Sequence, residues 1–392
     1  MLPGALTPTL QAHLSRLGAR LSFAEAAAEL GHLKGVRVAA STARRRTEAD
    51  GAVYAARQDA EAARVLAEAP PPRRGPAVQQ VSVDGAMVGL TDGSWREVRT
   101  LAIGTVVPGR QPGTVRCEEG SYFARMCDAA TFITLATGEM HRRGVETAGV
   151  VALVADGADW EQTFGDSHCP EAVRILDFPH GAQRLGDVAE AVWGTQETGQ
   201  TWAAGQRQEL RDGTPEAVLA AIQALPVAEA RDVAEAGRVQ AAVLGYLEPR
   251  LEQMRYAAFR AQGLPIGSGL VESANRHVVK ARLGGAGRRW AETNVTPLLA
   301  LRGALCSERW DEAWAAIAET RRDHAGRARR PAAPSAAAAA AASVAAPHRR
   351  SCLPASPALP RSGPKTIVNG RPTARHPWKR FPAVHPPPPA KL

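Results

Sequence analysis

The stretch Gly149-Val-Val-Ala-Leu-Val-Ala-Asp156-Gly157 is apolar throughout until it stops at an acid and a glycine. An uninterrupted run of this length predicts a β-strand buried on both faces, because a strand with one face in water alternates apolar and polar side chains. A second run, Val173–Phe178, has the same character. Two such strands predict parallel pairing under covering helices, which places the chain in the α/β class.

Three more strands are expected upstream, at Val78–Val83, Met87–Leu90 and Trp95–Ile103. The Asp-Gly pairs that begin at Asp84 and Asp92 supply hairpin-turn chemistry between them. A helix is expected over residues 122–136 or 139–147. A meander of hairpins that crosses over into buried parallel strands predicts a mixed α/β sheet.

Changes in composition and hydrophobic periodicity along the chain predict its organisation into segments. Proline runs interrupt both helices and sheets, and alanine-rich periodic stretches favour helices. The predicted segments are a helical DNA-binding domain over 1–68, a linker over 69–76, the first part of a catalytic core over 77–180, a helical insertion over 181–262, the second part of the core over 263–320, and a disordered basic tail over 321–392.

The first segment carries two helix-start signals. Ser22-Phe-Ala-Glu25 resembles a capping box, and Ser41-Thr42 precedes three consecutive arginines, Arg44, Arg45 and Arg46. Two short helices with arginines at the start of the second are typical of a helix-turn-helix, which would place these arginines on DNA. A small helical bundle with solvated arginines is the alternative.

Positive charge is concentrated in the tail. The chain carries +9 overall, but residues 321–392 hold 14 Lys+Arg and one acid, a net +13 that leaves −4 for residues 1–320. Low apolar content predicts disorder there, and the charge would add salt-dependent contacts with DNA.

The five cysteines show no paired CxxC spacing, so neither a zinc site nor a disulfide framework is indicated. The start of the chain lacks a signal-peptide pattern, and no segment has about 18 consecutive apolar residues. These features predict a soluble cytoplasmic protein with no membrane partner.

Three carboxylates stand at the ends of expected elements: Asp84, Asp156, and Glu272, which follows Gly267-Ser-Gly at the start of a helix. Asp84 and Glu272 have structural alternatives, respectively a hairpin turn and a first-turn helix residue. The position of Asp156 at the end of the most apolar strand favours function. Asp159 competes with Asp156 as a helix N-cap. Together, hard carboxylate oxygens could bind divalent cations for phosphodiester chemistry.

Further polar residues flank these acids. Asp177 ends the second buried strand, and His180 could hydrogen-bond a phosphate or orient a carboxylate; a plain turn is the alternative. After Glu272 come five cations with no acid among them, which could follow a DNA backbone or form a solvated helix face: Arg276, Lys280, Arg282, Arg288 and Arg289.

In this order the motifs resemble bacterial insertion-sequence transposases of the ISKra type, which are related to the Mutator-like class with an Asp-Asp-Glu active site. The resemblance spans most of residues 20–315. It rests on Val83-Asp84-Gly85, Ala155-Asp156-Gly157-Ala158-Asp159-Trp160, Asp177-x-x-His180, Gly267-Ser-Gly-Leu-Val-Glu272-Ser273, residues 282–290, Leu299-Ala-Leu-Arg302 and Arg309-Trp-Asp-Glu-Ala-Trp314.

The resemblance implies a ribonuclease-H-like fold with an all-helical insertion between the second aspartate and the glutamate. The spacing agrees, with 72 residues from Asp84 to Asp156 and 116 from Asp156 to Glu272. It implies that these three acids bind two Mg²⁺ ions about 3.5 to 4 Å apart, with Mn²⁺ as a substitute. Asp177 and His180 would belong to the same catalytic site.

The implied activity is metal-dependent strand cleavage and transfer at the ends of the protein's own element. The implied partners are double-stranded DNA, as terminal inverted repeats and target, and further copies of the chain in a synaptic complex at the bacterial nucleoid. Two alternatives remain. One is a catalytically decayed DNA-binding regulator, which the presence of all three acids disfavours; the other is a repair or resolvase nuclease, which would not account for the helical insertion.

Overall fold

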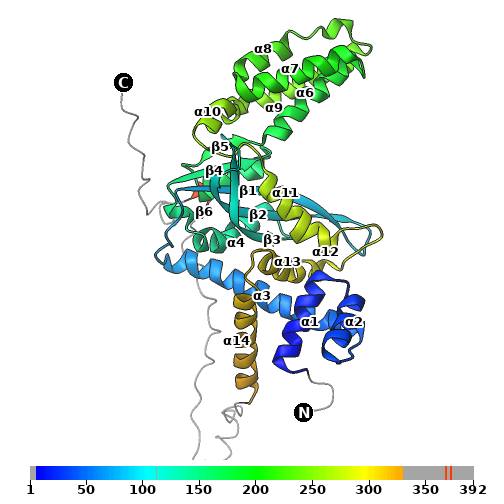
Figure 1. Ribbon diagram of the computed structural model, residues 1–392, viewed down its shortest axis with the longest axis vertical. Helices are drawn as coiled ribbons and strands as arrows, with labels where there is room; N and C mark the ends of the chain where they lie inside the picture. Colours follow the sequence, from blue (N-terminus) through cyan, green and yellow to red (C-terminus); the bar gives the residue numbers. More distant parts are fainter. Residues whose placement is uncertain (1–5, 112, 330–366, 369–370, 373–392) are drawn as a thin grey trace, which may run out of the picture.

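The computed structural model describes residues 6–111, 113–329, 367–368 and 371–372, and its centre is a five-stranded mixed sheet (Figure 1). The sheet order is β3-β2-β1-β4-β5, with β1 antiparallel to β2, β2 antiparallel to β3, and β1, β4 and β5 parallel. The strands are β1 (Val78–Gly89), β2 (Trp95–Pro108), β3 (Val115–Arg125), β4 (Val150–Ala155) and β5 (Val173–Leu176). The expected mixed α/β class is therefore confirmed.

The two apolar runs form the buried parallel strands β4 and β5, as predicted. The hairpin predicted at Asp84 is wrong, because β1 continues through Asp84, which pairs with Thr100 of β2. The turn predicted at Asp92 is confirmed: its side chain accepts hydrogen bonds from Ser94, and Gly93 adopts a φ of 89°. Met87–Leu90 is thus part of β1 rather than a separate strand.

Strand β3 was not predicted, because its outer half is polar and exposed at the sheet edge. The helix expected within 122–147 is α4 (Ala129–Arg142), which Asp128 caps by accepting from Thr131 N–H at 2.9 Å. It matches neither predicted range, because residues 122–125 belong to β3.

The sheet is covered on both faces. Val81, Val83 and Ile103 pack on one face against α4 and α5 (Asp159–His168), which contribute Phe132 and Phe164. The other face packs against the segment after Glu272 and against α13 (Glu292–Cys306), chiefly through Ala86, Val88, Val98, Val278, Val279 and Leu298.

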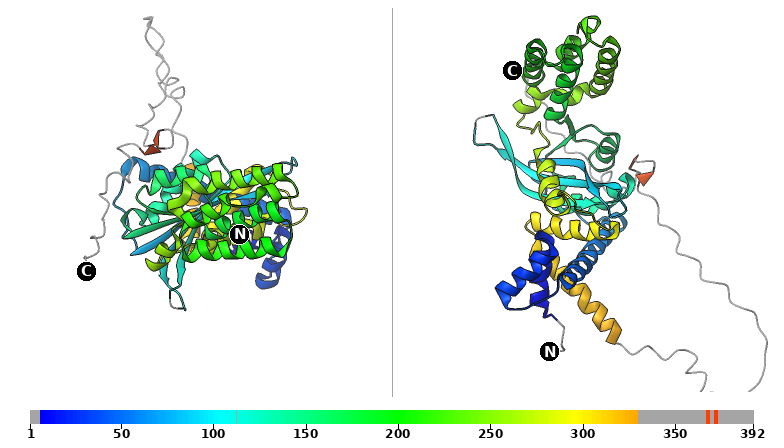
Figure 2. Two further views of the ribbon diagram at one scale, coloured as in Figure 1. Left: turned by 90° about the horizontal axis from the view of Figure 1, so that it is seen from above. Right: turned by 90° about the vertical axis from the view of Figure 1, so that its right-hand side faces the viewer.

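A block of helices stands beyond β5 at one end of the molecule, and the N-terminal helices lie at the other (Figures 1 and 2). The block contains α6 (Phe178–Trp193), α7 (Glu197–Asp212), α8 (Pro215–Gln223), η2 (Val227–Glu229), α9 (Val233–Leu247), η3 (Glu248–Met254) and α10 (Tyr256–Ala261). Its apolar side chains join those of β4 and β5 in one core. The helical pattern expected over 181–262 is present.

The N-terminal segment forms α1 (Pro8–Arg20), α2 (Phe23–Lys34) and α3 (Ala40–Glu68). The predicted capping box is confirmed, since Ser22 and Glu25 exchange side-chain-to-backbone hydrogen bonds. The expectation of a short second helix is wrong, because α3 runs for 29 residues and packs against α4 and α13. It stops just before the prolines of segment 69–76, which has neither helix nor strand.

The expected single helical run after Glu272 is divided by a loop over residues 284–289. Its parts are α11 (Gly269–Ala274), the π-helical turn η4 (Asn275–Lys280), α12 (Ala281–Leu283), α13, and α14 (Trp310–Arg329). A short 3₁₀ turn, η1 (Val145–Thr147), precedes β4, and β6 (Ile367–Val368) pairs with β7 (Arg371–Pro372).

The disorder predicted for 321–392 concerns residues that lie mostly outside the described part of the chain, although α14 continues to Arg329. In the part that is described, no helix combines the length and the apolar character needed to cross a membrane.

Arg282 fastens the N-terminal helices to the core. Its side chain is buried, its Nε donates to Gly18 O at 3.0 Å, and its guanidinium lies 4.5 Å and 4.8 Å from the ring centroids of Phe23 and Trp290. Burial lowers its pKa to about 10, with the nearby charges of Arg288 and Arg302 adding to the effect. The predicted DNA contact at Arg282 is therefore corrected, because the side chain faces inward.

We expect Arg282→Ala to lower the free energy of unfolding by about 2 to 4 kcal/mol, because it removes a buried hydrogen bond and leaves a cavity between two aromatic rings. Urea unfolding followed by circular dichroism measures the change. Arg276→Ala, at an exposed position of the same segment, should stay within about 0.5 kcal/mol of wild type. Equal losses in both variants would contradict the proposed fastening.

Candidate metal centre

Three carboxylates meet just beyond the point where the parallel pairing of β1 with β4 ends. Each of Asp84, Asp156 and Glu161 offers an oxygen atom, and these oxygens all lie within 4.8 Å of one another. The register of the sheet explains the first two: Val81 of β1 pairs with Leu153 of β4, so Asp84 and Asp156, three residues further along, arrive at the same level. The sequence predicted this pair.

Glu161 was missed as a site residue. It lies in the first turn of α5, is 1% exposed, and its Oε2 accepts from Gly157 N–H at 3.0 Å and Ala158 N–H at 3.2 Å. Its place near the start of a helix is typical of the glutamate of a capping box, which could have directed attention to it. Burial, a hydrogen bond with Asp156 and that residue's charge raise its pKa to about 10.

The two aspartates respond differently to this environment. Burial and the charge of Asp156 raise the pKa of Asp84, against hydrogen bonds from Gly85 N–H at 2.6 Å and Asn275 Nδ2 at 2.7 Å. Burial opposes ionisation of Asp156 too, but hydrogen bonds from Glu161 and Ala158 N–H outweigh it and lower the pKa.

This donor set fits a divalent cation. Carboxylate oxygens are the hard ligands preferred by Mg²⁺, Mn²⁺ and Ca²⁺. Burial and the repulsion among the three carboxyl groups raise the pKa of Asp84 and of Glu161, and a bound cation would offset that repulsion in place of a proton. Asp84, Asp156 and Glu161 would be the residues that hold it.

Glu272 lies close by but outside this group of three. It sits exposed in the first turn of α11, where Ser268 Oγ donates to Glu272 Oε1 at 3.3 Å. Asn275, one turn further, donates to Asp84 Oδ2 and so docks this segment against the metal centre. The structure therefore brings the predicted glutamate-bearing helix to Asp84, while its carboxylate faces solvent.

Asp177 connects the insertion to the glutamate segment. It is fully buried; Oδ1 accepts from Ser268 N–H at 2.6 Å, and Oδ2 lies 3.1 Å from His180 N and 2.6 Å from His180 Nδ1. Gln80 Nε2 donates to Gly267 O at 3.1 Å and holds the same Gly-Ser-Gly turn from β1. Asp177 thus positions the residues around it.

His180 and Arg184 add positive charge beside the aspartates. The charge of His180 favours ionisation of both Asp84 and Asp156, and that of Arg184 favours ionisation of Asp156. The two residues are four apart on α6, which places them on one helix face. Arg184 was not predicted as part of the site.

The insertion is also fastened directly to the loop after β4. Tyr246 of α9 donates its hydroxyl to Asp156 O, and Arg250 Nη2 donates to Gly157 O at 2.6 Å. The guanidiniums of Arg184 and Arg250 lie 4.8 Å and 4.6 Å from the centroid of the Tyr246 ring. No sequence signal pointed to Tyr246 or Arg250, because their contacts depend on tertiary placement.

The predicted DNA-contacting cations fall into two exposed groups. Arg276 and Lys280 are exposed on η4, and Arg288 and Arg289 are exposed in the loop before α13. At the far end of the molecule, the start of α3 carries Arg44 and Arg45, both exposed, and Arg46, half-buried.

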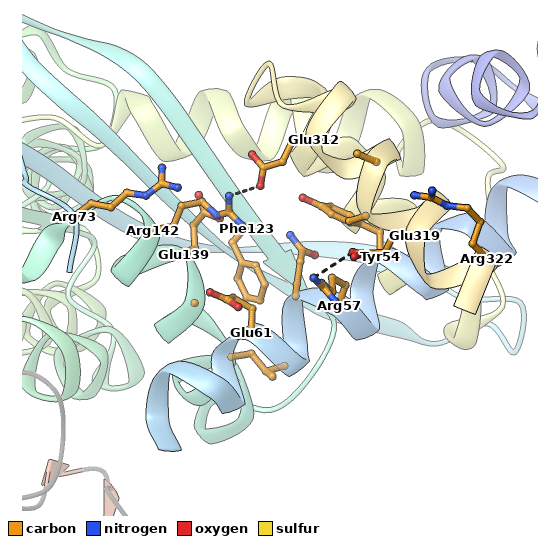
Figure 3. A pocket seen from close by; sticks show the side chains of 15 residues that line it. Tyr54, Arg57, Glu61, Arg73, Phe123, Glu139, Arg142, Glu312, Glu319 and Arg322 are labelled. Carbon is orange, nitrogen blue, oxygen red and sulfur yellow. Dashed lines mark hydrogen bonds and ion pairs between the residues drawn. The ribbon is translucent and has the colours of Figure 1, made fainter. Parts of the chain in front are cut away.

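A separate cavity of about 560 Å³ lies between α3, α4 and α14 (Figure 3). Arginines and glutamates face one another across it, and two ion pairs form among them: Arg57 lies 3.5 Å from Glu319, and Arg142 bonds Glu312. Because these pairs neutralise part of its charge, the cavity offers less to a charged ligand than the cluster of Asp84, Asp156 and Glu161 does.

No model of a known protein family matches the chain, and neither does any curated protein. The assignment of the site therefore rests on its geometry and chemistry.

We expect Mg²⁺ or Mn²⁺ to raise the midpoint of thermal unfolding in wild type and to leave it unchanged in Asp156→Asn, because a ligand that binds only the folded state stabilises it. Differential scanning fluorimetry with metal titration measures this. The matched control is Asp159→Asn, three residues away and exposed, which should respond like wild type. An undiminished response in Asp156→Asn would place the metal elsewhere.

The protonation of Glu161 predicts a pH effect without metal. Its folded-state pKa of about 10 lies above the ordinary 4.5, so the stability it contributes is complete below pH 4.5 and is lost as pH rises toward 10. Glu161→Gln keeps a neutral side chain and should avoid this loss. With a chelator present, the unfolding free energy of Glu161→Gln minus that of wild type should increase between pH 5 and pH 9, by up to about 1.4 kcal/mol per pH unit. Parallel pH curves would contradict a protonated Glu161.

Proposed function

We propose that the chain is a DNA transposase of the Asp-Asp-Glu class, resembling the ISKra type, that cleaves and joins strands at the ends of its own insertion sequence. The observation that carries the proposal is the cluster of three carboxylates just beyond the point where the pairing of β1 with β4 ends, with Asn275 of the glutamate segment bonded to Asp84.

The fold is compatible with a ribonuclease-H-like core. An antiparallel meander leads into two parallel strands, and a helical block separates the second aspartate from the glutamate segment. This is the arrangement that the resemblance implies for residues 77–320, with the insertion at 181–262.

In this proposal Asp84, Asp156 and Glu272 hold two Mg²⁺ ions, or Mn²⁺ in their place, and Glu161 is a further ligand within reach of both aspartates. When bound, these ions supply an activated nucleophile and stabilise the leaving oxygen in phosphodiester cleavage. Glu272 is exposed one turn before Asn275, and is the third acid that the proposal assigns.

The surrounding residues position these acids. Asn275 orients Asp84, and Glu161 shares a proton with Asp156 when no cation is present. Tyr246 and Arg250 fix the backbone beside Asp156. His180 is 40% exposed at its side chain and could donate to a phosphate oxygen next to the acids.

The proposed partner is double-stranded DNA, both terminal repeats and target, bound by several copies of the chain in a synaptic complex at the bacterial nucleoid. Exposed cations on η4 and the following loop support DNA binding, because cations beside a phosphodiester site hold the backbone in register.

A second candidate is a decayed transposase that binds DNA and regulates the element. The position of Glu272 outside the group of three carboxylates favours it. Metal-dependent cleavage separates the two candidates.

We expect Glu272→Gln to reduce excision of a mini-element, bounded by the repeats that flank the gene, by on the order of 10³-fold, because several kcal/mol of transition-state stabilisation is lost. Binding to the element's ends should persist. The matched control is Glu292→Gln, an exposed first-turn residue of α13. Loss of end binding together with excision would count against a catalytic role, and no excision by wild type in Mg²⁺ would favour the regulator.

A further inference from the structure

Two large apolar side chains lie exposed on one face of the β1–β2 hairpin. Met87 is 54% exposed and Trp95 is 56% exposed. The register pairs Gly89 with Trp95, Met87 with Glu97 and Gly85 with Arg99, so these residues alternate with the buried ones and share a face. Nearer the sheet centre the same face is covered by α4 and α5.

Two glycines make this face flat. A Cβ atom at Gly85 would lie 2.2 Å from Glu97 Oε1, and one at Gly89 would lie 2.1 Å from Arg289 Nη1. The side chains of Glu97 and Arg289 therefore lie directly across β1, with Met87 between them. We call the surface formed by Met87, Trp95, Glu97, Arg99 and Arg289 the hairpin strip.

Arginine–aromatic contacts stand at both ends of the hairpin strip. The Arg289 guanidinium lies 4.9 Å from the centroid of the Trp95 ring, and that of Arg99 lies 5.3 Å from the Trp160 ring. Glu97 is neutralised by Arg99 at 2.6 Å, whereas no carboxylate of the described residues forms an ion pair with Arg289. The strip thus combines apolar surface with an unneutralised positive charge.

The hairpin strip contacts segments that flank the candidate site, whereas Asp84 itself points to the opposite face of β1. Trp160 directly precedes Glu161 of the metal centre. At the other end, Trp290 N–H donates to Gly89 O at 3.1 Å and Thr91 N–H donates to Trp290 O at 3.0 Å. The loop that follows the glutamate segment is therefore paired with the hairpin, and the two lie side by side in Figure 1.

We propose that the hairpin strip binds single-stranded DNA, with an unpaired base stacked on Trp95 and Met87 and a phosphate held by Arg289. Every base has a flat face that stacks on an aromatic ring, and an adjacent arginine contributes both charge and stacking. This inference rests on the proposed function, because that function makes DNA the partner of the chain.

The test measures binding of the full chain to a fluorescently labelled single-stranded oligonucleotide by anisotropy. Trp95→Ala should weaken binding about ten-fold, since one stacked base accounts for roughly a 5- to 150-fold change, and Trp95→Phe should retain most of the affinity. Arg289→Ala should reduce the slope of log K against log salt by about 0.7. Val233→Ala, which truncates another exposed apolar residue, serves as the control and should bind like wild type.

Unchanged affinity in Trp95→Ala, with wild-type circular dichroism, overturns the proposal. So does sedimentation in which Trp95→Ala turns a dimer into a monomer without altering DNA affinity, because the strip would then be an interface between copies. Cleavage is measured separately with wild type and Asp156→Asn. Binding that depends on Trp95, without cleavage, would contradict the proposed function but support DNA binding by the hairpin strip. Cleavage with no effect of Trp95→Ala on binding would support the proposed function and contradict DNA binding by the strip.

Discussion

The parallel pairing of β1 with β4 is the constraint on which the site depends. It fixes Asp84 and Asp156 at one level, three residues beyond the last pair of β1 and β4, where both are partly removed from water. Two carboxylates in such a place repel each other, and Glu161 adds a third. Without metal, a proton on Glu161 reduces the repulsion among the three carboxyl groups. A bound cation would reduce it with both aspartates ionised. The same backbone register thus brings together repelling carboxylates and a set of oxygen ligands that fits a divalent cation.

Hydrogen bonds then tie distant segments to this pair of strands. Asn275 reaches Asp84, Tyr246 reaches the carbonyl of Asp156, and Asp177 holds the turn before Glu272. Each bond alone contributes about 1 kcal/mol, but leaving a buried partner such as Asp177 unsatisfied would cost more. These hydrogen bonds therefore help to position the helical insertion and the glutamate segment. Removing one of them should change the geometry of the carboxylates.

The sequence allowed prediction of β4, β5 and the meeting of Asp84 with Asp156, because a fully apolar strand that ends in an acid is typical of a buried parallel sheet with polar groups at its edge. It misplaced the hairpin at Asp84, since an Asp-Gly pair is compatible with both a turn and a paired strand. Glu161 and Tyr246 could not be recognised, because their roles arise only when α5 and α9 are placed in space. Arg282 was assigned to DNA because a local run of cations does not reveal which one faces inward.

The most direct test of a metal centre built by β1 and β4 is anomalous diffraction from crystals grown with Mn²⁺. We expect an anomalous peak within coordination distance of the carboxylates of both Asp84 and Asp156. The glutamate that lies beside this peak, Glu161 or Glu272, is then identified as the third ligand. Mn²⁺ bound elsewhere, with these two side chains free of metal at saturating concentration, would contradict the account.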